Sequence, residues 1–432
     1  MSSLSQGAAR ALYSSLLRVA APAYLLRLWR RGAREPGYRK ALAERFGRYS
    51  GPRPEPGALW VHAVSLGETR AAIPLIDALR EQQPGLRLLL THGTATGRAA
   101  GQALLRQGDV QAWLPYDTPG AARRFLQHFR PVAGVLMETE LWPNLMHEAE
   151  RLRVPVVLAN ARLSARSARK GRRMAALLHP AARRLTLALA QTGADAQRLR
   201  DAGVAQVIVD GNLKFDLTPP ARLLARGLEW RQSMTRPVVL AANTREGEEQ
   251  ALLEAWRELP QPRPLLLLVP RHPQRFDEVG AMVLALGMTL ARRSSWKDQP
   301  PEAVADVWLG DSMGEMPLYY ACADVALLGG SFAPLGGHNL IEAAACGCPL
   351  VMGPHTFNFA QAAEQSLAAR ASMQVQDIGA GVIAALALVH DPARNEWVQR
   401  AFAFAASHRG AAQQMAARIL ALVTPGRGAP DA

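Results

Sequence analysis

A glutamate in a strand-to-helix turn is the first residue of this chain whose position could support chemistry. Glu68 ends the sequence Ser-Leu-Gly-Glu (65–68), which directly follows the short apolar run 58–64. The glycine before it lets the backbone approach a ligand closely, and a carboxylate just beyond a strand can act as a general base. The same position would also let Glu68 complement the dipole of the following helix. The position in the sequence leaves both roles open.

Two more carboxylates and a lysine follow other strands. Glu138 and Glu140 stand directly after the apolar run 132–137, and on a continuing strand their side chains would share one face. Burying two carboxylates is costly unless they serve a site or are paired, so pairing with arginine is the alternative to catalysis. Lys214, in the segment 211–216, could neutralise a departing phosphate, or it could be a solvated surface lysine.

A glycine-rich loop in the second half of the chain is the strongest single signal. It runs from Gly329 to Gly337 and opens a helix at residues 339–342 (Asn-Leu-Ile-Glu). Free backbone N–H groups at a helix N-terminus, beside small glycines, form an anion site suited to a nucleotide phosphate. Asn339 and Glu342 also match an N-cap and N3 pair, so a capping box competes as the explanation for both.

Two other turns of the second half follow apolar strands. Pro270 and Arg271 end the run 265–269, and the planar guanidinium of Arg271 could bind a phosphate or a carboxylate. Residues 311–315 follow the run 307–309 and are expected to face the same cleft. The chain contains no Asp-x-Asp pair, which favours a mechanism without a metal ion.

These segments need a scaffold that gathers the ends of strands, and the apolar runs predict one. Short buried strands alternate with helical stretches, which is typical of a parallel, doubly wound sheet that binds ligands beyond its carboxyl edge. We expect an α/β protein with two Rossmann-like domains facing a cleft, the glycosyltransferase B fold. Strands are predicted at 58–64, 87–91, 132–137, 154–158, 186–190 and 207–209, and then at 238–242, 265–269, 288–290, 307–309, 325–328 and 349–352.

The same pattern predicts the domain boundaries. Residues 1–50 form an apolar and basic N-terminal segment, and residues 51–216 form the first Rossmann-like domain. Residues 217–236, which include a Pro-Pro pair, form the linker to a second Rossmann-like domain at 237–424. A helical stretch at 395–422 is expected to pack back across the hinge.

The N-terminal segment is interpreted as a membrane-associated helix. Residues 8–29 are apolar, with Arg10, Arg18 and Arg27 spaced along them, and further basic residues follow. A spanning helix would bury Arg18 near its middle at a cost of roughly 2.5–3.5 kcal/mol on insertion scales. An interfacial amphipathic helix whose cations meet anionic headgroups fits better. The alternative is an N-terminal helix that packs on the first domain.

Charge and cysteine content limit the partners and the compartment. The 432 residues carry a formal net charge of +14, which suits anionic partners such as nucleic acid, acidic lipid or phosphorylated small molecules. The scattered surface arginines could also reflect a GC-rich genome. Three cysteines without regular spacing argue against a disulfide framework and indicate a reducing compartment.

Taken together, the motifs resemble those of the 3-deoxy-D-manno-octulosonic acid (Kdo) transferases of Gram-negative bacteria. The resemblance runs from about residue 10 to about residue 420, with the motifs in order and at compatible spacing. It is carried by HAVSLGET (62–69), LPYDTP (114–119), METELWPN (137–144), ANARLSARS (159–167), GNLKFD (211–216), LVPRHPQRF (268–276), GDSMGEM (310–316) and GGHNLIEAAACGCPLVMGPHTFNF (336–359).

This resemblance implies a reaction, a location and roles for individual residues. The family transfers Kdo from CMP-Kdo to the lipid A precursor (lipid IVA), with inversion and without a metal or a cofactor. The resemblance places the enzyme on the cytoplasmic side of the inner membrane, with anionic lipids but no nucleic acid as partners. It implies that Glu68 deprotonates the acceptor's 6′-hydroxyl and that Glu138 and Lys214 support the transition state. The residues that match the CMP-binding segments are Pro270, Arg271, Met313, Gly314, Glu315, Asn339, Leu340, Ile341 and Glu342.

Two other functions compete with this one. A glycosyltransferase B enzyme that uses a UDP- or GDP-hexose and another lipid acceptor would need room and charge for a diphosphate. A membrane-bound nucleotide-binding scaffold without catalysis would have no need to keep Glu68, Glu138 and Lys214 together.

Overall fold

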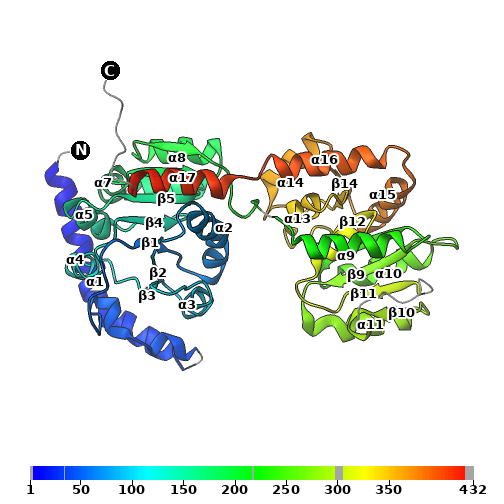
Figure 1. Cartoon of the computed structure of the whole chain (residues 1–432), viewed down its shortest axis with the longest axis horizontal. Coiled ribbons are helices and arrows are strands. Elements are labelled where there is room, and N and C mark those ends of the chain that lie inside the picture. The colour runs from blue at the N-terminus through cyan, green and yellow to red at the C-terminus, as the bar shows by residue number, and fades with distance from the viewer. Residues whose placement is uncertain (1–2, 34, 217, 297–304, 424–432) are drawn as a thin grey trace, which may run out of the picture. The chain divides into compact units, whose positions relative to one another are not determined.

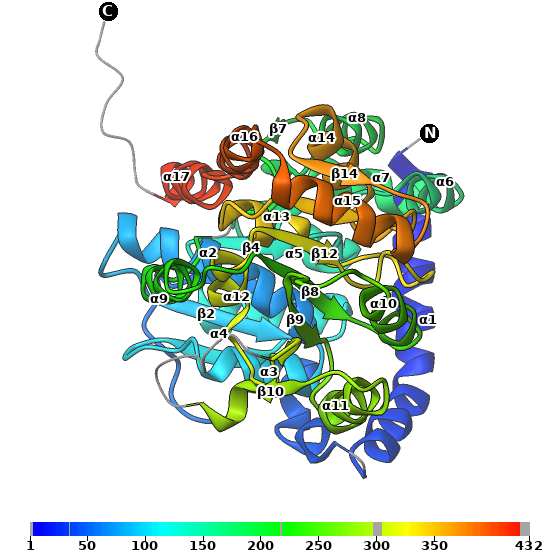
Figure 2. The ribbon, with the colours of Figure 1, turned by 90° about the vertical axis from the view of Figure 1, so that its right-hand side faces the viewer.

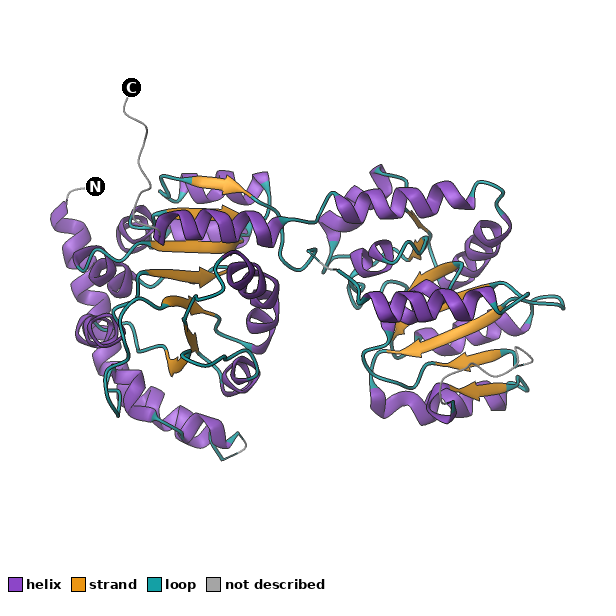
Figure 3. Cartoon of the chain, in the orientation of Figure 1, coloured by secondary structure: helices purple, strands orange, loops and turns teal. Residues whose placement is uncertain are grey.

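The computed structural model describes residues 3–33, 35–216, 218–296 and 305–423, which form two compact units (Figure 1). The chain leaves the first unit after Asp216 and returns to it at Gly410. Each unit contains one parallel sheet with helices on its faces (Figure 3).

The sheet of the first unit has seven strands in the order β3-β2-β1-β4-β5-β6-β7, and all pairs are parallel. This order reverses between β1 and β4, as in doubly wound folds that bind ligands at that point. The strands are β1 (Leu59–His62), β2 (Leu88–His92), β3 (Val110–Trp113), β4 (Ala133–Met137), β5 (Val156–Ala161), β6 (Leu187–Ala190) and β7 (Val207–Val209). The helices are α1 (Ser3–Arg31), η1 (Pro36–Arg39), η2 (Leu42–Phe46), α2 (Leu66–Gln82), α3 (Ala95–Gln102), α4 (Pro119–Phe129), α5 (Pro143–Arg151), α6 (Ala165–Arg172), α7 (Ala175–Arg183), α8 (Gly193–Asp201) and α17 (Ala411–Val423).

The sheet of the second unit is also parallel and doubly wound, in the order β10-β11-β9-β8-β12-β13-β14, with β11 inserted between β9 and β10. Figure 2 shows β8, β9 and β12 between α9 on one side and α10 on the other. The strands are β8 (Val238–Thr244), β9 (Leu265–Pro270), β10 (Leu290–Arg292), β11 (Val307–Leu309), β12 (Val325–Leu328), β13 (Leu350–Met352) and β14 (Ser372–Gln374). The helices are α9 (Ala221–Gln232), α10 (Glu248–Arg257), η3 (Pro273–Arg275), α11 (Phe276–Ala285), η4 (Arg293–Ser295), α12 (Met316–Cys322), α13 (Leu340–Ala345), α14 (Ala360–Ala368), α15 (Ile378–His390) and α16 (Arg394–Ala406).

Strand β1 shows why the central strands read as continuous apolar runs. Leu59 and Val61 belong to the hydrophobic cluster on one face of the sheet, and Trp60 belongs to the cluster on the other. Successive side chains of a strand point to opposite faces, and both faces of a parallel sheet are covered. The neighbouring strand carries Gly134 opposite Trp60, because a Cβ there would lie 2.5 Å from the indole ring.

Helix α1 packs along the first unit, as the alternative interpretation of the N-terminal segment expected. It contacts α5, α7 and η1. The side chain of Asn144 donates to the Ser14 hydroxyl at 3.0 Å, and Leu28 is buried. Among the described residues, no helix combines the length and the apolar character that a membrane span requires.

The compact units correct the predicted domains at two places. The predicted helix 395–422 is two helices, α16 and α17, separated at Gly410, and α17 packs on α2 of the first unit. The amides of Gly410 and Ala412 donate to the Asp216 carboxylate at 3.1 Å and 2.6 Å. The second domain predicted to end at 424 therefore ends at Arg409. The predicted linker 217–236 contains α9, which packs on α12 of the second unit.

Candidate active site

Glu68 lies in the first turn of α2, directly beyond the end of β1. Ser65 is the N-cap of this helix: its oxygen accepts from the Glu68 amide at 3.4 Å, and its hydroxyl donates to the Glu68 carboxylate at 3.2 Å. The Val64 amide donates to the other carboxylate oxygen at 2.8 Å. These bonds form a capping-box arrangement in which the amide of Val64, one residue before the N-cap, takes the place of the N-cap amide, so the helix-capping role is real. An ionised carboxylate offers about four lone-pair sites, and Glu68 therefore retains the capacity to accept a proton.

Glu138 directly follows β4 in a strained backbone conformation. Its φ of 60° lies in the left-handed region, which is uncommon for residues other than glycine. Strand β5 holds it there: the Glu138 amide donates to the Ala159 carbonyl at 2.9 Å, and the Arg162 amide donates to the Glu138 carbonyl at 3.2 Å. Its carboxylate lies 3.1 Å from the Nζ of Lys214. Strain of this kind concentrates at functional sites.

Lys214 reaches Glu138 because the segment after β7 is tied to the end of β5. Asn160, in β5, has a φ of 51°, and its side-chain oxygen accepts from the Leu213 amide at 3.1 Å. The Lys214 amide donates to the side chain of Asn212 at 3.0 Å. Two segments that are distant in sequence thus meet at one edge of the sheet.

A third carboxylate, Glu140, belongs to the same cluster. Burial raises the pKa of Glu140 to about 7, and the charges of Glu68 and Glu138 add to this shift. Burial also raises the pKa of Glu68; the Val64 amide opposes the shift, Glu138 adds to it, and Lys214 opposes it. An ionised carboxylate with a raised pKa is a stronger base than an exposed one. The sequence raised Glu140 together with Glu138 as a candidate but did not place it among the catalytic residues.

We expect Glu140→Gln to raise the melting temperature at pH 8 but not at pH 5. The folded-state pKa of about 7 lies above the ordinary value of 4.5. The protonated Glu140 carboxyl therefore contributes its full stabilisation of the folded state below pH 4.5, and this contribution is lost as the pH rises through 7. Glutamine removes the buried charge present above that pH. Calorimetry should show the variant about 2–4 °C above the wild type at pH 8, which corresponds to roughly 1 kcal/mol. An equal difference at both pH values would contradict the raised pKa.

The glycine-rich loop of the second unit follows β12 and folds against the end of β8. A Cβ on Gly329 would lie 2.3 Å from the carbonyl oxygen of Asn243, so the position requires glycine. The buried Glu248 carboxylate accepts from the amides of Gly330 at 2.8 Å and Phe332 at 3.1 Å. These two loop amides are therefore occupied by a carboxylate of the protein. The phosphate site was predicted at the N–H groups that begin the following helix, and it stays a prediction.

The helix that follows this loop, α13, begins with the other predicted residues. Asn339 is its N-cap, and the side-chain oxygen accepts from the Ile341 amide at 3.1 Å. The side chains of Leu340 and Ile341 are buried in the core, so these two residues can offer only backbone groups to a ligand. Burial raises the pKa of the Glu342 carboxyl, and the charge of Arg271 opposes this shift.

Cationic groups gather at the ends of β8 and β9. Arg271 directly follows Pro270, the last residue of β9. Burial, together with the charges of Arg271, Arg245 and His272, lowers the pKa of His338 to about 4. The Nε2 atom of His338 is buried and has no hydrogen-bond partner within the described part of the chain. Guanidinium groups beside a neutral imidazole can bind a phosphate.

The last predicted segment turns at Gly314, whose φ is 81°, after strand β11. Because β11 pairs with β9, this turn lies at the same edge of the sheet as Arg271. Arg293 holds the Glu315 carboxylate with two bonds of 2.9 Å and 3.0 Å. The Met313 side chain is 68% exposed, so this side chain and the backbone at Gly314 are placed to contact a ligand.

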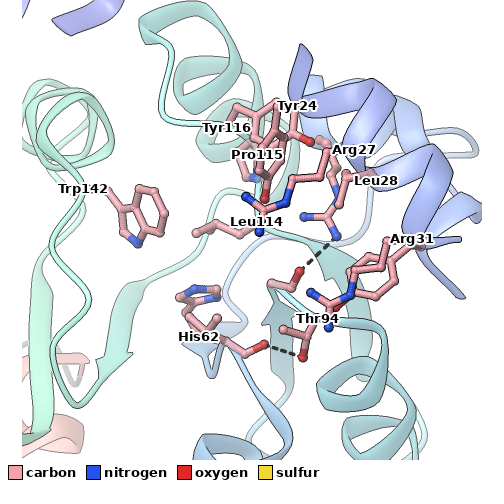
Figure 4. A pocket seen from close by; sticks show the side chains of 14 residues that line it. Tyr24, Arg27, Leu28, Arg31, His62, Thr94, Leu114, Pro115, Tyr116 and Trp142 are labelled. Carbon is pink, nitrogen blue, oxygen red and sulfur yellow. Dashed lines mark hydrogen bonds between the residues drawn. The ribbon is translucent and has the colours of Figure 1, made fainter. Parts of the chain in front are cut away.

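A cavity of about 240 Å³ adjoins the carboxylate cluster in the first unit (Figure 4). Helix α1 forms one wall, and the segments beyond β1 and β2 form another. Val64 and Trp142 line it, and they belong to the turns that carry Glu68 and Glu140. The sequence pattern of α1 predicted a membrane-associated helix and gave no sign of this cavity.

Two parallel Rossmann-like sheets, each with polar and charged groups at its carboxyl edge, define the glycosyltransferase B fold class. The solved structure of the Anabaena protein Alr3699/HepE in complex with UDP is similar to this chain with a TM-score of 0.56 at 16% identity. The likeness covers 84% of this chain and 99% of that one. At this level of identity it shows the fold.

Sequence comparisons identify the family within this class. Residues 40–217 match the family model described as 3-deoxy-D-manno-octulosonic-acid transferase (kdotransferase). The Kdo transferase of Bordetella pertussis is 48% identical over 94% of this chain and 97% of its own length. That of Haemophilus influenzae is 38% identical over 81% of this chain and 83% of its own length. The chain belongs to the Kdo transferase family and is a glycosyltransferase.

Proposed function

We propose that this enzyme transfers Kdo from CMP-Kdo to the lipid A precursor (lipid IVA), with inversion and without a metal ion. The observation that carries the proposal is the cluster of Glu68, Glu138 and Lys214 at the carboxyl edge of the first sheet in a member of this family. The described residues include no group of three or more His, Cys, Asp or Glu side chains placed to hold a metal ion. The metal-independent mechanism is a prediction.

Each member of the cluster has a distinct part in the proposed reaction. As the nucleoside monophosphate leaves, positive charge develops at the anomeric carbon of the sugar. The acceptor hydroxyl transfers its proton to the Glu68 carboxylate while its oxygen bonds to that carbon. Lys214 compensates the charge of Glu138 at 3.1 Å, and this pair supports the transition state. Inversion follows because the hydroxyl attacks the face opposite the leaving group in one displacement.

We assign the CMP group to the carboxyl edge of the second sheet. The charges of Arg271 and Arg245 act on His338 there, and they suit the single phosphate of a nucleoside monophosphate. The turn at Gly314 and the start of α13 are the segments that we expect to contact the nucleoside. The proposed donor-binding residues are Pro270, Arg271, Met313, Gly314, Glu315, Asn339, Leu340, Ile341 and Glu342.

Mass spectrometry of the reaction products tests this function. The full-length protein is incubated with a tetra-acylated lipid A precursor and either CMP-Kdo or a UDP- or GDP-hexose. We expect the acceptor to gain one or more Kdo residues with CMP-Kdo and nothing with the hexose donors. Transfer of a hexose and not of Kdo would support the alternative function, a glycosyltransferase that uses a UDP- or GDP-hexose. Binding of CMP without any product would support the non-catalytic scaffold.

We further propose that α1 attaches the enzyme to the cytoplasmic surface of the inner membrane. Leu12, Leu16 and Val19 are 63%, 61% and 80% exposed, although they are apolar. Their spacing of four and three residues places them on one side of the helix. Arg18 on the same helix would meet the headgroups of anionic lipids.

Replacing these three apolar residues by glutamate should release the protein from vesicles. We expect the fraction that sediments with vesicles containing anionic phospholipid to fall at least tenfold, because the variant loses apolar area and gains repulsion. Transfer to detergent-dispersed acceptor should persist. Leu228→Glu is the control, because Leu228 is 52% exposed on a helix of the second unit. Unchanged sedimentation of the triple variant would disprove the attachment through this face.

A further inference from the structure

Buried polar groups without partners mark the cavity beneath α1. The Nε atom of Arg45, a residue only 3% exposed, has no hydrogen-bond partner among the described residues. The same holds for the Nε2 atom of the fully buried His62 and for the Tyr116 hydroxyl. All three residues line the cavity. Each unpaired buried group costs roughly 1–3 kcal/mol, so their convergence indicates a site for a polar ligand.

The lining of the cavity is positively charged. Arg27 and Arg31 enter it from α1, and Arg45 enters it from η2. Arg31 is paired with Glu35 at 3.2 Å, whereas Arg45 donates to the carbonyl of Gly93 at 3.1 Å. No aspartate or glutamate occurs among the described residues that line the cavity. The ligand that complements this lining is an anion.

His62 adds a neutral hydrogen-bonding group to the lining of the cavity. Burial lowers the pKa of His62 to about 3, so the imidazole is neutral. Its Nδ1 atom lies 3.1 Å from the Thr91 carbonyl oxygen and 2.9 Å from the Thr91 hydroxyl oxygen. The Nε2 atom is left to form a hydrogen bond with a ligand in the cavity. A ligand with anionic oxygens and a nearby hydroxyl, such as a phosphorylated sugar, satisfies both the arginines and this nitrogen.

The size and position of the cavity connect it to the acceptor. Its volume of about 240 Å³ is roughly eight times the space of one liquid water molecule. It is smaller than the ~300–1,000 Å³ of sites for whole drug-sized ligands. Val64 lines the cavity, and its amide holds the Glu68 carboxylate at 2.8 Å. In Figure 4, Arg27 extends from α1 toward the space that Tyr116 and His62 border.

We propose that this cavity binds a phosphate-bearing sugar end of the acceptor lipid and thereby presents the acceptor hydroxyl to Glu68. The inference rests on the proposed function, in which the acceptor is a phosphorylated glycolipid. Arg27, Leu28 and Arg31 of α1 line the cavity, and the exposed Leu12, Leu16 and Val19 of the same helix are the residues proposed to reach the membrane. One helix therefore joins the membrane surface to the acceptor site.

Arg27→Gln tests the proposal with Arg30→Gln as the matched control. Both arginines are exposed on α1, but Arg27 lines the cavity and Arg30 does not. We expect Arg27→Gln to raise the KM for the tetra-acylated precursor about tenfold, because it removes a charge-assisted bond to phosphate. The kcat and the KM for CMP-Kdo should stay within about twofold. Equal effects of the two substitutions would overturn the proposal, because they would indicate general attraction to anionic surfaces.

The same acceptor without its phosphates separates the possible ligands. For the wild type its KM should be about tenfold higher, and Arg27→Gln should add no further loss. If Arg27→Gln still raised the KM about tenfold for the dephosphorylated acceptor, the proposal would be overturned. Two further measurements would identify a different ligand of the cavity. An Arg27 effect that follows the fraction of anionic phospholipid would indicate a membrane headgroup. Equal inhibition by inorganic phosphate with the phosphorylated and the dephosphorylated acceptor would indicate that the cavity binds free phosphate.

A second variant and a binding assay distinguish a failure of the proposed subsite from a failure of the proposed function. Tyr116→Phe removes one buried hydroxyl while keeping the ring contacts with Tyr24 and Phe46, and it should raise the acceptor KM about threefold. Acceptor binding is also measured without CMP-Kdo. Tighter binding of the phosphorylated lipid with no transfer of Kdo would defeat the proposed function and leave the subsite standing. Transfer with equal affinity for both lipids would defeat the subsite alone.

Discussion

Glu68→Gln is expected to lower the kcat of Kdo transfer by at least about 10³-fold while the affinity for CMP stays unchanged. General base catalysis contributes roughly 10²–10⁴-fold, and a glutamine amide cannot take the proton of the acceptor hydroxyl. Glutamine can replace glutamate in a capping box, so the bonds from Val64 and Ser65 have a substitute and α2 should keep its first turn. Steady-state kinetics and calorimetric titration with CMP measure the two effects.

Ser65→Ala is the control that separates the structural role of Glu68 from the chemical one. It removes the N-cap of α2, whose loss costs about 1 kcal/mol of stability, but it keeps the carboxylate. We expect a lower melting temperature and a kcat within about tenfold of the wild type. The proposed base is rejected if Glu68→Gln retains more than a tenth of the activity, or if Ser65→Ala is as inactive as Glu68→Gln.

Lys214→Met should lower kcat about 10²-fold and move the acid limb of the pH–rate profile to higher pH. Losing one group that stabilises transition-state charge typically costs about 10²–10³-fold. The charge of Lys214 also opposes the increase in the pKa of Glu68. Without it that pKa rises further, so the base stays protonated up to a higher pH and activity is lost sooner as the pH falls. Profiles of kcat against pH from 5 to 9 measure the displacement.

Lys214→Arg keeps the charge beside Glu138 and serves as the control. It should leave the acid limb in place, even if kcat falls because the guanidinium has another shape. A loss of activity in Lys214→Met with an unshifted profile would mean that the lysine acts without influencing Glu68. An unchanged kcat would remove Lys214 from the mechanism. The bond of 3.1 Å to Glu138 would then be structural.

The fold was predictable wherever the sheet is buried on both faces. The central strands β1, β4, β8, β9 and β12 are near-continuous apolar runs, and the predicted strands overlap them. Strands β3 and β14 were missed because Val110–Trp113 and Ser372–Gln374 lie at sheet edges and contain polar residues. An edge strand depends on one neighbour, so its sequence carries a weaker pattern. The return of α17 to the first unit depends on a distant carboxylate, Asp216.

In the glycine-rich loop, a distant residue binds two of the amides that the motif presents. The loop's glycines and the following helix are typical of a phosphate site. The decisive residue is Glu248, which stands more than eighty positions earlier and binds the amides of Gly330 and Phe332. A motif specifies the conformation of its own backbone. It does not specify which anion satisfies that backbone, because the anion can come from any part of the chain.

The sequence by itself determined the two parallel sheets, the family, and Glu68, Glu138 and Lys214 as candidates. Those properties depend on local patterns: apolar runs, residues that end strands, and motifs in a fixed order. Only the tertiary structure decided that Glu68 is also half of a capping box, that Glu140 joins its cluster, and that α1 covers a cationic cavity. The pKa of a carboxyl and the ligand of a cavity depend on burial and on charges from distant segments, and these are set when the chain folds.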